Sequence, residues 1–440
     1  MSASLRDEAV ELLQRLLRLN TVNPPGNETL AAELLRDYLE ANGVEVELYG
    51  RVPERMNLVA RLRGGDGPSL CFLSHTDTVV ADPTEWSRDP WSGDLVEDEV
   101  WGRGALDMKN QVAASAVAIA SLAREGFTPP GDLIFVAAAD EEVGDNYGLQ
   151  WLCAEHPDAV RVDYAINEGG GERIELGGRA FYLCAAAEKM SSPLKITVHG
   201  RSGHASMPGI ADNALVKAAP LIERLAAYRP DARLGPVCGE ASIGPEVAGF
   251  LDAVLGEQPP PGEVLARLAE IDQLAVDTIE PLLSFTLSPT MIEASERRNV
   301  IPGTVQLVVD RRLLPGQSPE DVEPVIREIL GNGTDYDLET IERFGGTRSS
   351  LETPLKQVID SWVESIEPGA RVAPLCCSGF TDSHWLREAF GTVAYGFFPM
   401  RTMDPEVAAR LIHSADERTH VDDLGLGVEF LRFAAQHLEG

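Results

Sequence analysis

The sequence predicts an α/β protein with a mixed, largely parallel sheet that is covered by helices on both faces. Strands alternate with helices from residue 5 to residue 166, as is typical of domains built on parallel sheets. The segment 133–139 is continuously apolar, which favours a strand in the middle of a sheet covered on both sides. From about residue 190 a second series of elements predicts a smaller α+β sandwich, inserted into the first domain.

The elements of the first part follow from hydrophobic periodicity and from turn residues. Apolar side chains at helical spacing predict helices over 5–18, 28–42 and 108–122. Apolar side chains that alternate or run together predict strands over 44–49, 57–62, 69–73, 133–139 and 163–166. Asn, Pro and Gly mark the breaks, most clearly in Asn23-Pro24-Pro25-Gly26.

The second series is read in the same way. Its predicted strands are 194–198, 299–312 and 336–343, and its predicted helices are 213–227 and 319–330. The long segment 229–290 is rich in Pro and Gly and contains helical pieces such as 262–280. A long helix resumes at 355–366. We therefore expect the first domain to comprise residues 1–191 and 346–440, and the inserted domain to comprise 192–345.

Composition excludes several classes of protein. The 440 residues carry a formal net charge of −33, which argues against binding to nucleic acid or to anionic membranes. No segment approaches about 18 consecutive apolar residues, so we expect no membrane span. The first residues do not resemble a signal peptide, and the six cysteines form no C-x-x-C pair, so we expect reduced thiols in a cytoplasmic protein.

The first candidate site residues are His75 and Asp77, at the end of the apolar run 69–73. Residues two apart on a strand project from the same face, so both side chains are expected in one site. Imidazole is a common metal ligand, and a neighbouring carboxylate can hold its other ring nitrogen. Alone the pair is weak evidence, because a histidine at a strand end is more often an ordinary structural residue.

Four further signals fit the same site. Asp107 lies where a strand leads into a helix, although an aspartate there is also a common helix N-cap. Asp140-Glu141-Glu142 ends the strand 133–139, and adjacent carboxylates repel one another unless a cation or solvent screens them. Glu168 follows the strand 163–166, and His413 lies late in the chain. Together these residues suit two metal ions that share a carboxylate.

The chain resembles the zinc metallopeptidase and deacylase family of aminoacylase, acetylornithine deacetylase, succinyl-diaminopimelate desuccinylase and glutamate carboxypeptidase. The matching segments occur in the family's order and span most of the chain. They are His75-Thr76-Asp77-Thr78-Val79, Gly102-Arg103-Gly104-Ala105-Leu106-Asp107-Met108-Lys109, Glu141-Glu142, Glu168, Gly203-His204-Ala205, Asn299-Val300-Ile301-Pro302 and His413.

The resemblance implies a role for each of these residues. His75, Asp107, Glu142, Glu168 and His413 would bind two Zn²⁺ ions, which Co²⁺ or Mn²⁺ can replace, with Asp107 shared between them. Glu141 would be the general base and Asp77 the partner that orients His75. His204, on an inserted lid and dimerisation domain, would stabilise an oxyanion in the partner subunit of a homodimer. Asn299, Arg312 and Gly379 would bind the substrate.

The function expected from this resemblance is hydrolysis of the amide bond of an N-acyl amino acid or a short peptide with a free carboxylate. Arg312 suits such a carboxylate because guanidinium binds it bidentately. A dizinc aminopeptidase or dipeptidase is the nearest alternative, and a non-catalytic binding protein on the same scaffold is a remote one. The residues leave open which acyl group and which amino acid are recognised.

Overall fold

The computed structural model describes residues 4–144, 146–228 and 245–439. The chain divides into two compact units. The first unit comprises Met1–Ala186, Ser349–Leu375 and Thr381–Gly440, and the second unit comprises Ala187–Arg348 and Cys376–Phe380. Of the predicted segment 229–290, residues 229–244, which include Cys238, lie outside the described part.

The first unit is built on a mixed sheet of nine described strands, in the order β1-β2-β6-β3-β7-β18-β9-β17, with β8 paired to β9. The strands are β1 (Glu45–Tyr49), β2 (Asn57–Leu62), β3 (Leu70–His75), β6 (Leu133–Ala138), β7 (Tyr164–Asn167), β8 (Arg173–Leu176), β9 (Arg179–Glu188), β17 (Arg371–Cys377) and β18 (Val393–Gly396). The four central strands β6, β3, β7 and β18 are parallel, whereas β1, β2 and β9 pair antiparallel with their neighbours.

Helices cover both faces of this sheet, as the sequence predicts. One core is formed with α1 (Leu5–Leu17), α2 (Thr29–Ala41), α3 (Lys109–Arg124), α11 (Pro354–Ile366) and α14 (Val421–His437). The opposite core is formed with α4 (Leu149–Glu155), α5 (Pro157–Val160) and α12 (Ser383–Phe390). Because side chains alternate along a strand, Phe72 and Phe135 enter the first core while Leu73 and Val136 enter the second.

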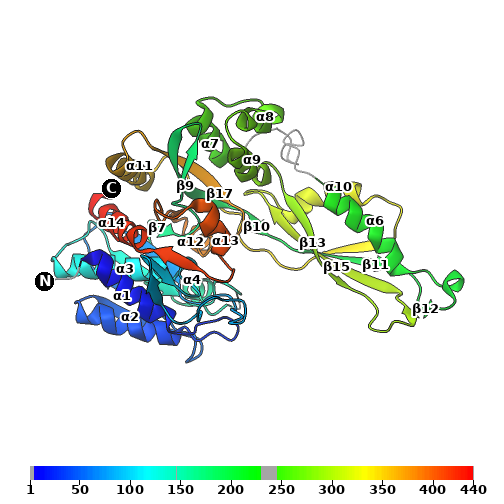
Figure 1. Cartoon of the computed structure of the whole chain (residues 1–440), viewed down its shortest axis with the longest axis horizontal. Helices are drawn as coiled ribbons and strands as arrows, with labels where there is room; N and C mark the ends of the chain where they lie inside the picture. The colour runs from blue at the N-terminus through cyan, green and yellow to red at the C-terminus, as the bar shows by residue number, and fades with distance from the viewer. Residues whose placement is uncertain (1–3, 145, 229–244, 440) are drawn as a thin grey trace. The chain divides into compact units, whose positions relative to one another are not determined.

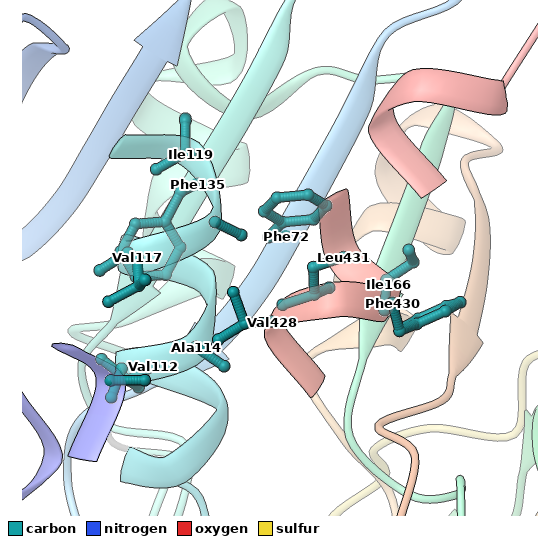
Figure 2. Packing of buried hydrophobic residues seen from close by; sticks show 14 of the residues in the cluster. Phe72, Val112, Ala114, Val117, Ile119, Phe135, Ile166, Val428, Phe430 and Leu431 are labelled. Carbon is teal, nitrogen blue, oxygen red and sulfur yellow. The ribbon is translucent and has the colours of Figure 1, made fainter. Parts of the chain in front are cut away.

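Figure 2 shows the first core, where Phe72 and Phe135 lie among apolar side chains of α3 and α14. The helices α1, α3 and α14 also pack against one another on this face (Figure 1). All of these side chains are buried, which fixes the parallel strands whose carboxyl ends carry the candidate site. A small three-stranded sheet, β4 (Asp94–Val96), β5 (Glu99–Trp101) and β19 (Arg418–His420), together with α13 (Pro405–Leu411), completes the unit.

The second unit contains a sheet in the order β10-β15-β11-β16, with β13 also paired to β15. Its strands are β10 (Met190–Ser191), β11 (Leu194–His199), β13 (Thr286–Glu293), β15 (Thr304–Leu313) and β16 (Tyr336–Thr340). The helices α6 (Ala214–Ala227) and α10 (Pro319–Leu330) share a core with this sheet. Three further helices, α7 (Pro245–Leu255), α8 (Val264–Ala269) and α9 (Gln273–Ile279), come from the long segment.

The fold class predicted from the sequence is confirmed, with two differences in the second unit. The strand predicted over 299–312 is interrupted at Pro302-Gly303, and forms β14 (Val300–Ile301) and β15 instead. The strand β13 was not predicted, because Pro289 lies inside it; the proline is accommodated at a bulge between Pro289 and Met291. None of the helices in the described ranges is long and apolar enough to cross a membrane. The five described cysteines are free thiols.

Candidate metal centre

Three neighbouring parallel strands bring candidate ligands to one edge of the first unit's sheet. His75 is the last residue of β3, Glu141 and Glu142 follow β6, and Glu168 directly follows β7. Since β3 lies between β6 and β7 and all three are parallel, their carboxyl ends meet. The two remaining candidates come from connecting segments: Asp107 precedes α3, and His413 follows α13.

Asp107 lies between the two histidines. Its Oδ1 is 3.3 Å from Nε2 of His75, and its Oδ2 is 2.9 Å from Nε2 of His413. Nε2 of His413 also lies 3.3 Å from Oε2 of Glu142. Nε2 of His75 lies 3.8 Å from Oε1 of Glu168 and 4.0 Å from Oε2 of Glu141. The structure therefore brings together all five predicted ligands and Glu141, in one unit.

This set of side chains fits bound cations. Ligand atoms of His75, Asp107 and Glu142 lie within 4.8 Å of one another, as do those of His75, Glu141 and Glu168. Glu142 has a buried carboxylate oxygen, Oε1, with no hydrogen-bond partner. A buried carboxylate oxygen without a partner is costly unless a cation compensates it. Imidazole and carboxylate are suitable ligands for zinc and similar divalent ions.

The electrostatics of the site also favour bound cations. Burial raises the pKa of Glu168 to about 7, and burial together with the Glu168 carboxylate raises the pKa of Glu141 well above its usual value. Hydrogen bonds to Asp107 and Glu142 raise the pKa of His413 to about 10. Without metal, His413 and, below about pH 7, Glu168 thus retain protons, whereas the contacts with both histidines lower the pKa of Asp107. Metal ions would displace these protons on binding.

Asp77 is fully buried and connects three of these residues. Its Oδ1 is 3.4 Å from Nδ1 of His75 and accepts the main-chain N–H of Glu141 at 3.1 Å. Its Oδ2 accepts the main-chain N–H of Glu142, also at 3.1 Å. The strand ends at His75, so the expectation that both residues lie on one strand face is wrong. Asp77 reaches the imidazole from the segment after the strand.

Sequence reasoning missed a buried network behind Asp77. Asn23 donates from Nδ2 to both Asp77 and Asp140, each at 3.0 Å. Asp140 also binds the guanidinium of Arg55 at 3.1 Å, and Arg55 forms a buried ion pair with Glu28. Asp140 has a φ of +65°, a conformation that a non-glycine residue rarely adopts. The sequence signals only a turn at Asn23 and an acidic run at Asp140, so no pattern links these residues.

The second unit places His204 beside Asn299. The short strand β12 (Gly203–His204) pairs with β14, and the N–H of Ala205 donates to the main-chain oxygen of Asn299 at 3.0 Å. Nδ1 of His204 accepts the main-chain N–H of Ser206 at 3.2 Å. In the neutral ring the proton is therefore on Nε2, which makes His204 a hydrogen-bond donor at that atom. Both His204 and Asn299 are exposed.

Arg312 and Gly379 lie in other parts of the second unit. Arg312, near the end of β15, forms a two-point ion pair with Asp310 at 2.9 and 3.0 Å. Gly379 belongs to the segment Cys376–Phe380, in which Phe380 stacks on Phe344 of the same unit. A Cβ at Gly379 would meet no atom within 4 Å, so the space beside this residue is open.

The fold and this arrangement of histidines and carboxylates define the class of metal-dependent hydrolases. The sequence model of "Peptidase family M20/M25/M40" matches residues 71–437, and the chain belongs to this family. The family expected from the sequence motifs is thereby confirmed.

Individual proteins agree with this assignment. The chain is 29% identical over 425 residues to a succinyl-diaminopimelate desuccinylase from Xanthobacter autotrophicus, covering 94% of each protein. An M20 family metallo-carboxypeptidase from Sulfolobus solfataricus has the same fold, with a TM-score of 0.71, 18% identity, and coverage of 98% of this chain and 99% of that one. A dinuclear metal-binding M20 peptidase from Bacillus subtilis gives a TM-score of 0.62 at 13% identity, covering 99% and 98%. The chain is accordingly a metallohydrolase that acts on amide bonds.

Proposed function

We propose that this chain is a dinuclear zinc amidohydrolase that cleaves the amide bond of an N-acyl amino acid or a short peptide with a free carboxylate. The observation that carries the proposal is the position of Asp107, which turns one carboxylate oxygen toward each of two histidines. A carboxylate shared in this way suits two metal ions about 3.5–4 Å apart, the separation common to two-metal hydrolases.

The contacts support one set of ligands for each ion. His75, Asp107 and Glu168 would hold the first ion, and His413, Asp107 and Glu142 would hold the second. Zinc suits these nitrogen and oxygen donors, and Co²⁺ or Mn²⁺ would be accepted as well. When bound, the ions supply polarisation of the scissile carbonyl and acidification of the attacking water.

Glu141 moves the proton in the proposed reaction. It accepts a proton from the attacking water and delivers it to the nitrogen of the leaving amine. Its main-chain N–H donates to Asp77, and its carboxylate lies 4.0 Å from Nε2 of His75, beside the proposed ligands. Glu168 and Glu141 lie at similar distances from Nε2 of His75, 3.8 and 4.0 Å, so the assignment of Glu168 as ligand and Glu141 as base follows the resemblance to the family.

The second unit would recognise the substrate. The protonated Nε2 of His204 would donate a hydrogen bond to the developing oxyanion, and the adjacent Asn299 would bind substrate beside it. Arg312 would bind the substrate carboxylate, which then competes with Asp310 for the guanidinium. The open position at Gly379 would allow close approach of the main chain to the substrate.

We also propose that the chain forms a homodimer through the second unit. Exposed apolar side chains lie on the segment 207–216 and on β13 of this unit, where α6 packs against β13, and such side chains favour association. They are Met207, Ile210, Leu215, Val216, Met291 and Ile292. In such a dimer His204 would serve the active site of the partner subunit. The proposed location is the cytoplasm, in keeping with the five free thiols.

The test is a substrate panel assayed with added zinc, cobalt or manganese. It contains N-succinyl-diaminopimelate, N-acetyl and N-succinyl amino acids, N-acylated amino-acid amides, and dipeptides with free or blocked amines. We expect cleavage of N-acylated substrates with a free carboxylate, abolished by chelation and restored by metal. The desuccinylase relative makes the N-succinyl compounds the leading candidates. Cleavage restricted to substrates with a free α-amine would instead establish the aminopeptidase or dipeptidase alternative.

A further inference from the structure

Glu417 is a fully buried carboxylate that the metal ligands do not account for. Its Oε1 accepts the main-chain N–H of Leu106 at 2.7 Å and of Asp107 at 3.0 Å. Its Oε2 accepts the main-chain N–H of Gly104 at 2.9 Å. One side chain therefore fixes three peptide groups of the loop that ends in Asp107, including the peptide of Asp107 itself.

Arg103 extends this contact to the segment that carries His413. Its guanidinium donates to Oε2 of Glu417 at 2.6 Å and, from its other end, to the main-chain oxygen of Ser414 at 3.0 Å. The guanidinium also lies 5.2 Å from the ring centre of Trp86, which holds it in place. The two loops are thus joined through one buried ion pair.

His413 depends on such anchoring more than the other ligands do. Its side chain is 53% exposed, and its φ of +61° is unusual for a residue with a Cβ. His75, by contrast, is buried at the end of a central strand. The position of His413 relative to Asp107 is therefore determined by the loops on either side.

We propose that Glu417 is a positioning residue that sets the distance between Asp107 and His413, and thereby the affinity for the second metal ion. The proposal rests on the dinuclear function proposed above. Three N–H groups and a guanidinium donate to this carboxylate. A neutral amide in its place would direct an N–H₂ group at some of these donors. It would also leave Arg103 buried without a carboxylate to balance its charge.

The experiment compares wild-type protein with Glu417→Gln and with the matched control Glu367→Gln. Glu367 also pairs with an arginine, Arg173, in the first unit, but lies outside the metal centre. Bound zinc is measured by elemental analysis at buffered free zinc concentrations, and cobalt binding is followed by its visible spectrum. Wild type and Glu367→Gln should bind two ions per chain, whereas Glu417→Gln should bind the second ion about 10–100-fold more weakly. Excess metal should restore much of its activity.

A folded Glu417→Gln protein that binds two ions with wild-type affinity would overturn the proposal. Failure of the wild type to bind two ions would instead refute the dinuclear function itself. If Glu417→Gln does not fold, Arg103→Lys provides the second variant, because lysine keeps the charge but cannot contact Glu417 and Ser414 in the same way. We expect Arg103→Lys to lower the affinity for the second ion selectively. Two ions bound with wild-type affinity would count against the proposal.

Discussion

His75 and Asp77 are joined at two points: Nδ1 of the imidazole lies 3.1 Å from the main-chain oxygen of Asp77 and 3.4 Å from its carboxylate. Both partners are acceptors, so Nδ1 carries a proton, and in the neutral ring Nε2 then presents its lone pair to the site. Asp77→Asn should therefore weaken metal binding about 10–100-fold and lower kcat/KM with it. Metal titration of the apoprotein checks this, and unchanged zinc affinity would contradict the orienting role.

Glu141→Gln separates proton transfer from metal binding. The amide keeps the size of the side chain but cannot accept the proton, so kcat should fall about 10²–10⁴-fold while two metal ions remain bound. Steady-state kinetics and elemental analysis on the same preparation provide the measurement. Glu142→Gln is the matched comparison, since it should lose metal as well as activity. A Glu141→Gln enzyme with near wild-type kcat would show that another group is the base.

Asp107→Ala should remove the group shared by the two histidines. We expect the variant to bind at most one ion and to lose activity, even though it remains folded by circular dichroism. Added metal should not restore turnover, because the variant lacks the carboxylate that would hold both ions together. An Asp107→Ala protein that is active and carries two ions would exclude the shared-ligand assignment.

The raised pKa values predict how pH affects the metal-free protein. The pKa of Glu168 rises from 4.5 to about 7 and that of His413 from 6.5 to about 10. A group with a raised pKa in the folded state stabilises the fold below its unfolded pKa, and this contribution is lost as pH rises through the folded value. The Tm of the apoprotein should fall from pH 5 to 7 as Glu168 ionises, and further toward pH 10 as His413 does. Zinc-loaded protein should lack this trend.

Calorimetry provides an independent check of the same pKa values. Zinc binding at pH 7 should release protons, because His413 and part of Glu168 are protonated in the apoprotein. Titration in two buffers of different ionisation enthalpy measures that release. Zero proton release would mean that these groups are already deprotonated without metal.

Arg312→Ala tests the carboxylate-binding role in the second unit. Loss of a bidentate guanidinium should raise KM for substrates with a free carboxylate by about 10–100-fold and leave metal content unchanged. For the corresponding amides KM should not change, so the diagnostic quantity is the rise in KM for the acid relative to that for its amide. An equal rise in KM for the acid and the amide would assign Arg312 a structural role with Asp310.

The central strands and the proximity of the candidate ligands could be predicted because short local segments of the sequence mark both. Strand β6 reads as an uninterrupted apolar run, and His75, Glu142 and Glu168 each follow such a run. The network of Asn23, Arg55 and Asp140 could not be predicted, since no local pattern marks Asn23 or Arg55 as a partner of Asp140. Pairing of Arg312 with Asp310 likewise depends on side-chain placement that the sequence pattern leaves open.

The two main-chain hydrogen bonds that Asp77 accepts from Glu141 and Glu142 have a wider consequence. They hold the main chain of the proposed base and that of a proposed ligand at one carboxylate, so a main-chain shift at one residue is passed to the other. An ion of different radius that shifts the main chain of Glu142 should also shift that of Glu141. In this chain, the preference for a metal ion and the rate of proton transfer are therefore coupled through Asp77, and a mutation that changes one should change the other.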